Sequence, residues 1–390
     1  MTTSLDFNEA LLQFRVDNSL DTPAYVYDES VIEQKLENLQ RLREKSGCKI
    51  LFSLKAMSCS GLLDKIACSV DGFSASSVFE SRLAREILGD TGTVHMTSPG
   101  ISESGISGLA RYCDYISYNS TSQWQRLRKY SKGINNGLRI NPEISFGHDS
   151  RYDPCRQGSR LGAPLSRLPA FSENPSLYEG LNGLHVHNNF ESTNYTELTG
   201  TIDSVRQLHS ELFESMQWLN LGGGYLLEDR NGLDYLADWI LETRQEFALD
   251  VFFEPGKAVV GKAGYLIASV TDLFDSGDST IAVLDTSINH LPEVFEYQLR
   301  PKVIGDTPGG KCTYQLAGAS CLSGDIFGVY SFDRQLDIGS RVIFANVGAY
   351  MMVKANMFNG INLPSVYSVD NENRVILHKR YDYQDYRNRL

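Results

Sequence analysis

The fold is constrained most by a regular alternation of short apolar runs with amphipathic segments, which begins at Thr22 and continues to about residue 265. The segment 29–46 shows the helical half of this pattern, with apolar residues three and four positions apart. Strands are predicted at 24–27, 51–57, 72–75, 93–96, 115–117, 137–140, 183–187, 218–221 and 251–254. About nine strands that alternate with helices predict a closed (β/α) barrel, which needs eight. The first strand therefore belongs either to the barrel or to another domain.

The pattern changes after residue 263. Strand-like runs at 265–273, 280–285, 311–316, 340–344 and 374–378 are separated by turn sequences, and only 350–356 has helical character. We therefore predict an α/β protein with two domains. The first is a (β/α)8 TIM-type barrel over 22–265, and the second is an antiparallel β-sandwich or β-barrel domain built from 1–21 and 266–390.

The composition argues against several classes of partner. The 390 residues carry a formal net charge of -12, which disfavours nucleic acid and anionic membrane surfaces. No apolar run reaches the roughly 18 residues of a membrane span, and the N-terminal residues do not resemble a signal peptide. The 7 cysteines are scattered without metal-type spacing, so we expect free thiols in a reducing cytoplasm and no metal site.

Lys55 is the residue on which a functional interpretation depends. It lies near the end of the predicted strand 51–57, where a lysine either extends its ammonium to solvent or serves as a nucleophilic amine with a lowered pKa. Such an amine forms Schiff bases with carbonyls or with pyridoxal phosphate. The second interpretation requires backbone that binds a phosphate, an acid for a ring nitrogen and a proton donor elsewhere in the chain.

Candidates for these parts follow other predicted strands, where the functional groups of a barrel lie. The glycines 222–224 leave backbone N–H groups open to an oxyanion, although such a triplet is also typical of a plain turn. The segment 254–257, Glu-Pro-Gly-Lys, puts a carboxylate, open backbone and a cation at the end of another strand. His185 and His187 share one face of a strand and are either structural or able to stack on a planar ring.

Short motifs between Thr22 and Tyr367 carry a family resemblance. They are TPAYVYD at 22–28, LKA at 54–56, LRINPE at 138–143, YDPC at 152–155, GSRLG at 158–162, GLHVHN at 183–188, LNLGGG at 219–224, EPG at 254–256, CLSGD at 321–325 and MFNG at 357–360. Their order and spacing resemble the fold-type III pyridoxal-phosphate-dependent decarboxylases, the ornithine and diaminopimelate decarboxylase superfamily. Within it, the chain is most similar to the carboxynorspermidine/carboxyspermidine decarboxylases.

The resemblance implies an alanine racemase-like fold and pyridoxal 5'-phosphate as the cofactor. In this comparison Lys55 is similar to the Schiff-base lysine, His187 to the histidine that stacks on the pyridine ring, and Glu254 to the acid paired with the ring nitrogen. Arg139 resembles an arginine that holds this acid in place. The residues that resemble phosphate ligands are Gly222, Gly223, Gly224, Gly256 and Tyr350.

Further residues follow from the resemblance in the second half of the chain. Cys321 resembles the thiol that returns a proton to the product carbon, and in this superfamily it comes from the partner subunit. The resemblance therefore implies a homodimer with shared active sites. Glu293 and Asp325 fall where relatives contact the distal end of the substrate, and two carboxylates favour an amine-bearing tail. Either acid is alternatively a solvated loop residue, and Phe358 is expected beside the carboxylate that leaves.

The chain departs from relatives that act on carboxynorspermidine at 187–191, 254–257 and 328–330, where acidity and a thiol are lost and Lys257 is gained. Lys257 either contacts the cofactor phosphate or reflects a substrate that is less cationic or itself carries phosphate.

We therefore predict a cytoplasmic carboxy-lyase of polyamine biosynthesis that acts on a small amino-acid substrate with a 3-amino-3-carboxypropyl end group, led by carboxynorspermidine and carboxyspermidine. The same reaction on a specialised metabolite, such as a microcin C-type peptide–nucleotide, is an alternative. An amino-acid racemase and a non-enzymatic pyridoxal phosphate carrier are further alternatives. Cys321 and Asp325 argue against both, since a racemase has no use for this thiol and a carrier resembles the barrel alone.

Overall fold

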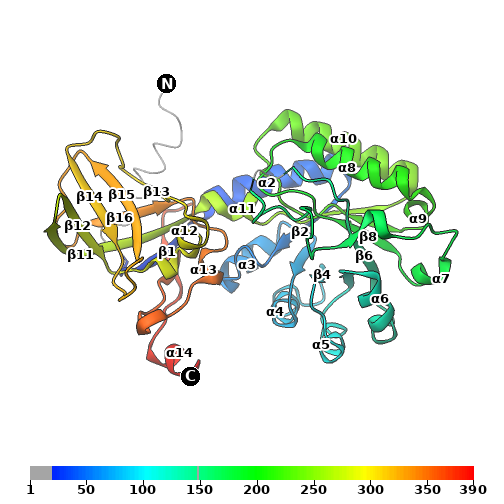
Figure 1. Cartoon of the computed structure of the whole chain (residues 1–390), viewed down its shortest axis with the longest axis horizontal. Helices are drawn as coiled ribbons and strands as arrows, with labels where there is room; N and C mark the ends of the chain where they lie inside the picture. The colour runs from blue at the N-terminus through cyan, green and yellow to red at the C-terminus, as the bar shows by residue number, and fades with distance from the viewer. Residues whose placement is uncertain (1–19, 147–148) are drawn as a thin grey trace. The chain divides into compact units, whose positions relative to one another are not determined.

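The computed structural model describes residues 20–146 and 149–390, and Figure 1 labels their elements along the chain. The chain divides into two compact units: residues 34–259 form the barrel unit, and residues up to 33 together with 260–390 form the β unit. The change of pattern predicted near residue 263 lies close to this division. Most of the segment 1–21, predicted to join the β domain, lies outside the described residues.

The barrel unit contains a closed ring of parallel strands. The ring runs in the order β5-β4-β3-β2-β10-β9-β8-β6, and β6 pairs back with β5. Its strands are β2 (Lys49–Ser53), β3 (Gly72–Ala75), β4 (Thr93–Ser98), β5 (Tyr115–Tyr118), β6 (Asn135–Asn141), β8 (Gly183–Val186), β9 (Trp218–Asn220) and β10 (Asp250–Phe253). The short β7 (Ala163–Pro164) pairs with β6 outside the ring. The predicted eight-stranded (β/α) barrel is confirmed.

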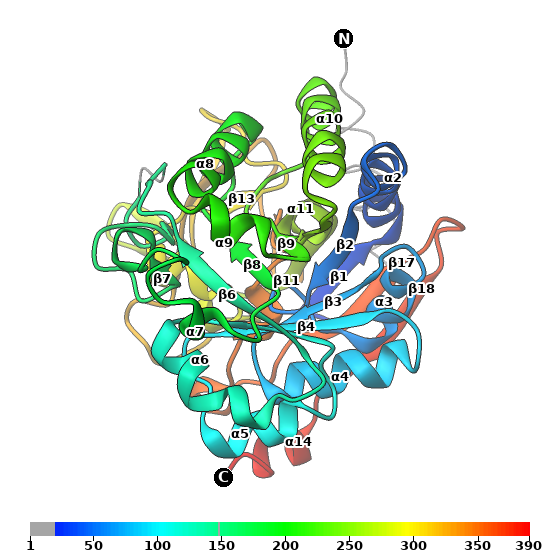
Figure 2. The ribbon, with the colours of Figure 1, turned by 90° about the vertical axis from the view of Figure 1, so that its right-hand side faces the viewer.

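Helices lie on the outside of this ring (Figure 2). They are α2 (Glu29–Ser46), α3 (Ser60–Ala67), α4 (Val78–Leu88), α5 (Glu103–Leu109), α6 (Thr121–Leu127), α7 (Pro175–Tyr178), α8 (Tyr195–Leu208), α9 (Ser210–Glu214), α10 (Arg230–Phe247) and α11 (Lys257–Val260). The predicted helix 29–46 has the bounds of α2, whose apolar stripe from Ile32 to Leu42 is buried. The helical spacing of apolar residues thus marks the side of each helix that packs on the ring.

The first strand belongs to the other sheet. β1 (Ala24–Asp28) pairs antiparallel with β11 (Gly264–Ser276) and parallel with β17 (Ser365–Val369). The predicted barrel range 22–265 therefore starts one strand too early, and the structure agrees with the other alternative for this strand. All five residues of β1 are buried. A fully buried run has the same local pattern in either sheet, so the sequence could not distinguish the two positions.

The β unit is built on a sheet in the order β15-β14-β12-β11-β1-β17-β18, with β16 on β11 and β13 on β16. Its other strands are β12 (Ser279–Leu284), β13 (Lys302–Val303), β14 (Cys312–Ala317), β15 (Ile326–Phe332), β16 (Arg341–Ala345) and β18 (Val375–Lys379). Its helices are α12 (Pro292–Tyr297), α13 (Met351–Lys354) and α14 (Tyr383–Arg387). Most pairings are antiparallel, but β1 with β17 and β12 with β14 are parallel. The predicted antiparallel domain is therefore a mixed sheet in which most pairings are antiparallel.

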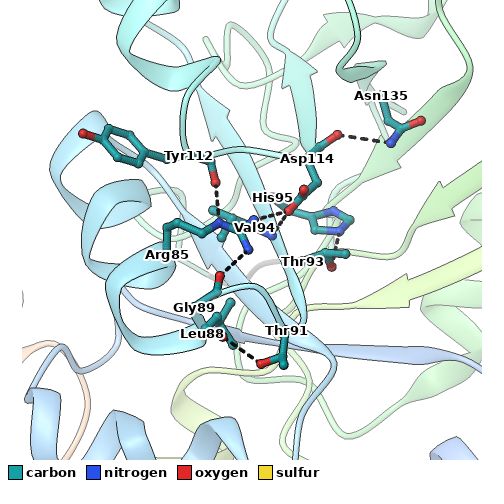
Figure 3. A network of polar contacts seen from close by, with 10 residues as sticks. All are labelled: Arg85, Leu88, Gly89, Thr91, Thr93, Val94, His95, Tyr112, Asp114 and Asn135. Carbon is teal, nitrogen blue, oxygen red and sulfur yellow. Dashed lines mark hydrogen bonds and ion pairs between the residues drawn. The ribbon is translucent and has the colours of Figure 1, made fainter.

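A polar network fixes the start of two barrel strands (Figure 3). Arg85 of α4 donates to the Asp114 carboxylate at 2.5 Å, to the Tyr112 carbonyl at 3.3 Å and to the Gly89 carbonyl at 3.1 Å. Asp114 also accepts the backbone N–H of Val94 on β4 at 2.8 Å. One guanidinium and one carboxylate thus join α4 to the entries of β4 and β5. This end of the barrel is the one where buried polar contacts serve stability.

We expect Arg85→Ala to lower the free energy of unfolding by about 1–3 kcal/mol, because it leaves the half-buried Asp114 carboxylate without its cation. The matched control is Arg82→Ala on the same helix, which removes an exposed pair with Glu86 and should cost about 0.5 kcal/mol or less. Urea denaturation followed by circular dichroism measures both. Equal losses in the two variants would contradict a structural role for the Arg85 network.

Candidate active site

Lys55 lies in a tight turn after β2. The strand ends at Ser53, so the predicted strand 51–57 is too long and the lysine follows the strand. The turn is fixed on both sides, because Ser53 N–H donates to the Pro255 carbonyl at 3.0 Å and Leu54 N–H donates to the Ser74 carbonyl at 3.0 Å. The backbone beside Lys55 is therefore held against β3 and against the segment that follows β10, at the carboxyl end of the ring.

The Lys55 amine has a lowered pKa. Burial lowers it from 10.5, and the positive charge of Arg139 lowers it further, while the Glu254 carboxylate acts in the opposite direction. The side chain is exposed by its accessible surface, yet protein fills most of the volume around the ammonium, and the desolvation of an ion depends on that volume. The lowered pKa is the feature that suits the interpretation as a nucleophilic amine.

Glu254 is a buried carboxylate at the end of β10. Its Oε1 accepts a hydrogen bond from Asn220 Nδ2 at 2.7 Å, and its backbone N–H donates to the Gly222 carbonyl at 2.7 Å. Asn220 Oδ1 accepts the N–H of Gly222 at 2.8 Å. Asn220 thus connects the acid to the glycine loop. Sequence reasoning missed this role, although Asn220 lies within the LNLGGG motif.

The glycine loop has no room for side chains. A Cβ atom at Gly223 would overlap the Glu254 carbonyl, one at Gly224 would overlap the Asn189 carbonyl, and one at Gly222 would lie 2.7 Å from the His187 Cβ. Gly222 and Gly224 have φ of +64° and +92°, which other residues rarely adopt. The loops after β8, β9 and β10 therefore meet backbone to backbone. This cradle of bare main chain fits a phosphate group.

His187 directly follows β8 and is neutral. Burial lowers its pKa well below 6.5, and the charges of Lys55 and Arg139 lower it further. The Gly223 N–H donates to His187 Nδ1 at 3.2 Å, so this nitrogen is an acceptor and any ring proton lies on Nε2. A neutral imidazole held to the glycine loop is suited to stack on a planar ring.

Arg139 and His185 lie inside the ring on β6 and β8, and both are buried. Burial lowers the pKa of Arg139, which nearby Cys155 and Glu254 partly restore. Among the described residues, neither ring nitrogen of His185 has a hydrogen-bond partner. Burial also lowers the pKa of His185 well below 6.5, so its ring is neutral. The Glu254 carboxylate thus interacts electrostatically with both cations, Lys55 and Arg139.

Gly256 and Lys257 complete the barrel group of predicted residues. A Cβ atom on Gly256 would lie 2.9 Å from the Ala56 Cβ, so this glycine lets the segment after β10 pack on the Lys55 turn. Lys257 Nζ forms a close ion pair with Glu191 Oε1 and lies 5.7 Å from the centre of the Phe190 ring. The lysine predicted to contact cofactor or substrate is therefore engaged by the loop after β8.

The remaining predicted residues lie on loops of the β unit. Cys321 is exposed, and its N–H donates to Asn359 Oδ1 at 2.9 Å. Phe358, next to that asparagine, has 45% of its surface exposed. Tyr350 precedes α13 with φ of +69°. Sequence reasoning missed Asn359, whose signal was its place in the MFNG motif.

The two acids expected to contact the substrate tail already have partners in the chain. Asp325 is buried, and its carboxylate accepts the N–H of Ile288 at 2.6 Å and the N–H and hydroxyl of Ser320, the former at 3.0 Å. Glu293 is also buried and lies 3.5 Å from Lys354 Nζ, which contacts Glu296 more closely. Asp325 therefore stabilises the loop that carries Cys321. Its burial contradicts the alternative of a solvated loop residue, and the contact with the substrate stays a prediction.

Since the Lys55 amine loses its proton more easily than an ordinary lysine, we expect its reaction with pyridoxal 5'-phosphate to rise with pH with a midpoint below 10.5. Borohydride trapping and mass spectrometry of the labelled peptide measure this reaction at a series of pH values. Surface lysines in the same digest are the internal control and should titrate higher. A Lys55 midpoint equal to theirs would contradict the lowered pKa, and Lys55→Met should remove the labelled peptide.

Comparison with known proteins gives a consistent result. A family model described as pyridoxal-dependent decarboxylase, pyridoxal binding domain, matches residues 29–261. The chain is 34% identical over 380 residues to a carboxyaminopropylagmatine decarboxylase of Synechocystis sp., covering 96% of each. It is 30% identical over 371 residues to a carboxynorspermidine/carboxyspermidine decarboxylase of Herminiimonas arsenicoxydans, covering 94% of the chain and 98% of the relative.

A solved structure resembles the whole chain. The carboxynorspermidine decarboxylase of Campylobacter jejuni, complexed with norspermidine, has a TM-score of 0.84 and 28% sequence identity, covering 95% of this chain and 100% of that one. The glycine loop without side chains, Lys55 with its lowered pKa and the neutral His187 fit the cofactor that the family model implies. The chain belongs to the pyridoxal-dependent decarboxylases and is a carboxy-lyase.

Proposed function

We propose that the chain removes the α-carboxylate from the 3-amino-3-carboxypropyl end of a polyamine-type substrate and leaves an aminopropyl amine. Carboxynorspermidine and carboxyspermidine are the leading substrates. The observation that carries this proposal is the similarity, over nearly the full length, to relatives that are named for substrates with a carboxyaminopropyl group. These named substrates share the carboxyaminopropyl group and differ in the rest of the molecule. The relatives therefore do not fix the rest of the substrate for this chain.

The proposed cofactor site is formed by loops of the barrel unit. Lys55 binds the cofactor covalently, and the phosphate lies in the glycine loop with Gly256, while Tyr350 of the β unit stays a predicted phosphate ligand. His187 stacks on the ring and Glu254 pairs with its nitrogen. When bound, pyridoxal phosphate supplies an electron sink for the electron pair that remains when carbon dioxide leaves.

The chain's own residues then have separate tasks. The lowered pKa of Lys55 makes its amine available as a nucleophile. Asn220 holds the Glu254 carboxylate in place through a hydrogen bond, and the positive charge of Arg139 partly compensates the negative charge of that carboxylate. Phe358 provides an apolar wall beside the departing carboxylate. The Cys321 thiol donates a proton to the product carbon. Glu293 is our candidate for the tail amine, because the family resemblance puts it where relatives contact the distal end of the substrate.

We also propose a homodimer in which Cys321 of one chain serves the site of its partner. The loop around this thiol exposes large apolar side chains: 36% of Leu322, 45% of Phe358 and 55% of Phe295. Phe295 lies beside the same loop, since a Cβ atom on Gly324 would be 3.4 Å from its ring. A thiol ringed by exposed apolar groups is suited to a protein interface.

The substrate proposal is tested by carbon dioxide release from a panel of compounds. We expect the highest kcat/KM with carboxynorspermidine, carboxyspermidine or carboxyaminopropylagmatine, and a value lower by at least about a hundredfold with diaminopimelate, whose tail carries a carboxylate where the site offers acids. Ornithine and lysine are further comparison substrates. A preference for diaminopimelate would overturn the substrate class while leaving the decarboxylase family intact.

The shared site is tested by mixing two inactive variants. Homodimers of Lys55→Ala and of Cys321→Ala each lack one part of both sites, but a mixed dimer holds one complete site. After subunit exchange at equal concentrations, about a quarter of the wild-type activity should return, because half of the dimers are mixed and each has one of two sites. Exchange is confirmed with differently tagged chains. Absence of recovery after exchange rejects donation of the thiol by the partner.

A further inference from the structure

Three loops that follow consecutive barrel strands meet at the glycine loop. The loop after β8 packs on one side, where the Asn189 carbonyl occupies the place of a Gly224 side chain and Ser192 N–H donates to the Gly224 carbonyl at 3.0 Å. The loop after β10 packs on the other side, where Glu254 N–H donates to the Gly222 carbonyl at 2.7 Å. The proposed phosphate cradle therefore lies between two outer loops.

One ion pair joins these outer loops across the cradle. Glu191 belongs to the loop after β8 and directly precedes Ser192, whereas Lys257 follows Gly256 on the other side. The two side chains are in close contact through Lys257 Nζ and Glu191 Oε1, and 29% and 37% of their respective surfaces are exposed. The pair is thus partly shielded from water, where the interaction of charges is stronger than on an open surface.

The lysine is held by an aromatic ring as well. Its Nζ lies 5.7 Å from the centre of the Phe190 ring, within the range of a cation–π contact. Phe190 is itself fixed by stacking on Tyr152, with ring centres 4.5 Å apart and an interplanar angle of 11°. The Lys257 ammonium is therefore engaged by both a carboxylate and an aromatic ring.

We propose that Lys257 makes the cradle competent for an anion by neutralising Glu191, and that it is not itself a phosphate ligand. The inference rests on the proposed role of the glycine loop. Without the lysine, the Glu191 carboxylate would be an uncompensated negative charge on a segment that packs against the cradle. A phosphate ester carries a charge of about -1.5 to -2 at neutral pH, so it would be repelled. Such repulsion at a separation of several Å changes a binding constant several-fold.

The test is the dissociation constant of pyridoxal 5'-phosphate for the apoprotein, measured by equilibrium dialysis, which does not depend on turnover. We expect Lys257→Met to weaken binding by about three- to tenfold. Glu191→Gln should bind at least as tightly as wild type, because it leaves the positive charge of Lys257 beside the cradle without its carboxylate partner. The double variant should return to within about twofold of wild type, since it restores the charge balance.

Pyridoxal without its phosphate is the matched ligand control, and Lys257→Met should leave its binding unchanged because the repelled charge is missing. Equal weakening of cofactor binding in Lys257→Met and in the double variant would overturn the proposal. That result is expected if Lys257 itself binds the phosphate, because removing Glu191 does not replace a lost phosphate ligand. Unchanged binding in all variants would overturn it as well. Thermal unfolding of each apoprotein checks that it is folded.

Gly223→Ala separates failure of this inference from failure of the cradle, because the added Cβ would overlap the Glu254 carbonyl. Gly200→Ala is its matched control, since a Cβ there meets nothing within 4 Å. If Gly223→Ala weakens cofactor binding and the ion-pair variants have no effect, only the role of Lys257 is wrong. If Gly223→Ala has no effect either, the phosphate does not bind at this loop.

Discussion

The site depends on one buried carboxylate, Glu254, and on the groups that compensate it. A buried carboxylate is costly unless cations and hydrogen-bond donors lie within reach. Here the donor is Asn220, at 2.7 Å, and the fields of Lys55 and Arg139 act on the same interior. These groups come from four different strands of the ring. The charge of Glu254 is therefore compensated only when the barrel is closed and the strand ends that carry these groups are in register.

The same closure explains the glycines. Strand ends that bring Lys55, His187 and Glu254 together also bring their following loops into contact, and there is no space for a Cβ atom at the centre of that contact. Glycine lets the loops approach and leaves main-chain N–H groups on the surface of the cradle. Electrostatics and sterics therefore act at one place: the packing that holds the acid also shapes the proposed phosphate site.

The β unit shows that a motif residue can have a structural contact that the sequence does not predict. Asp325 is expected to bind a substrate amine, and its buried carboxylate also accepts hydrogen bonds from Ile288 and Ser320 in the loop region of Cys321. A short acidic side chain beside a tight loop commonly accepts nearby backbone N–H groups. The acid thus shapes the loop that presents the thiol. Asn359, from the segment before β17, supports the same loop through the N–H of Cys321.

Much of this protein was determined by its sequence alone. Periodicity identified α2 to the residue and all eight strands of the ring, and motif order identified the cofactor family. The roles of Lys55, His187, Gly222 and Glu254 stay predictions. These features are local, because the spacing of apolar residues records which side of an element is buried.

Only the tertiary structure decided which distant segments meet. In the tertiary structure β1 pairs with β17, Asn220 donates a hydrogen bond to Glu254, and Lys257 forms an ion pair with Glu191. Each of these contacts depends on the closure of a sheet that brings together loops far apart in the chain. No local pattern contains that information. A lysine at a strand end has the same sequence context whether its partner is a phosphate, a substrate or a carboxylate on another loop.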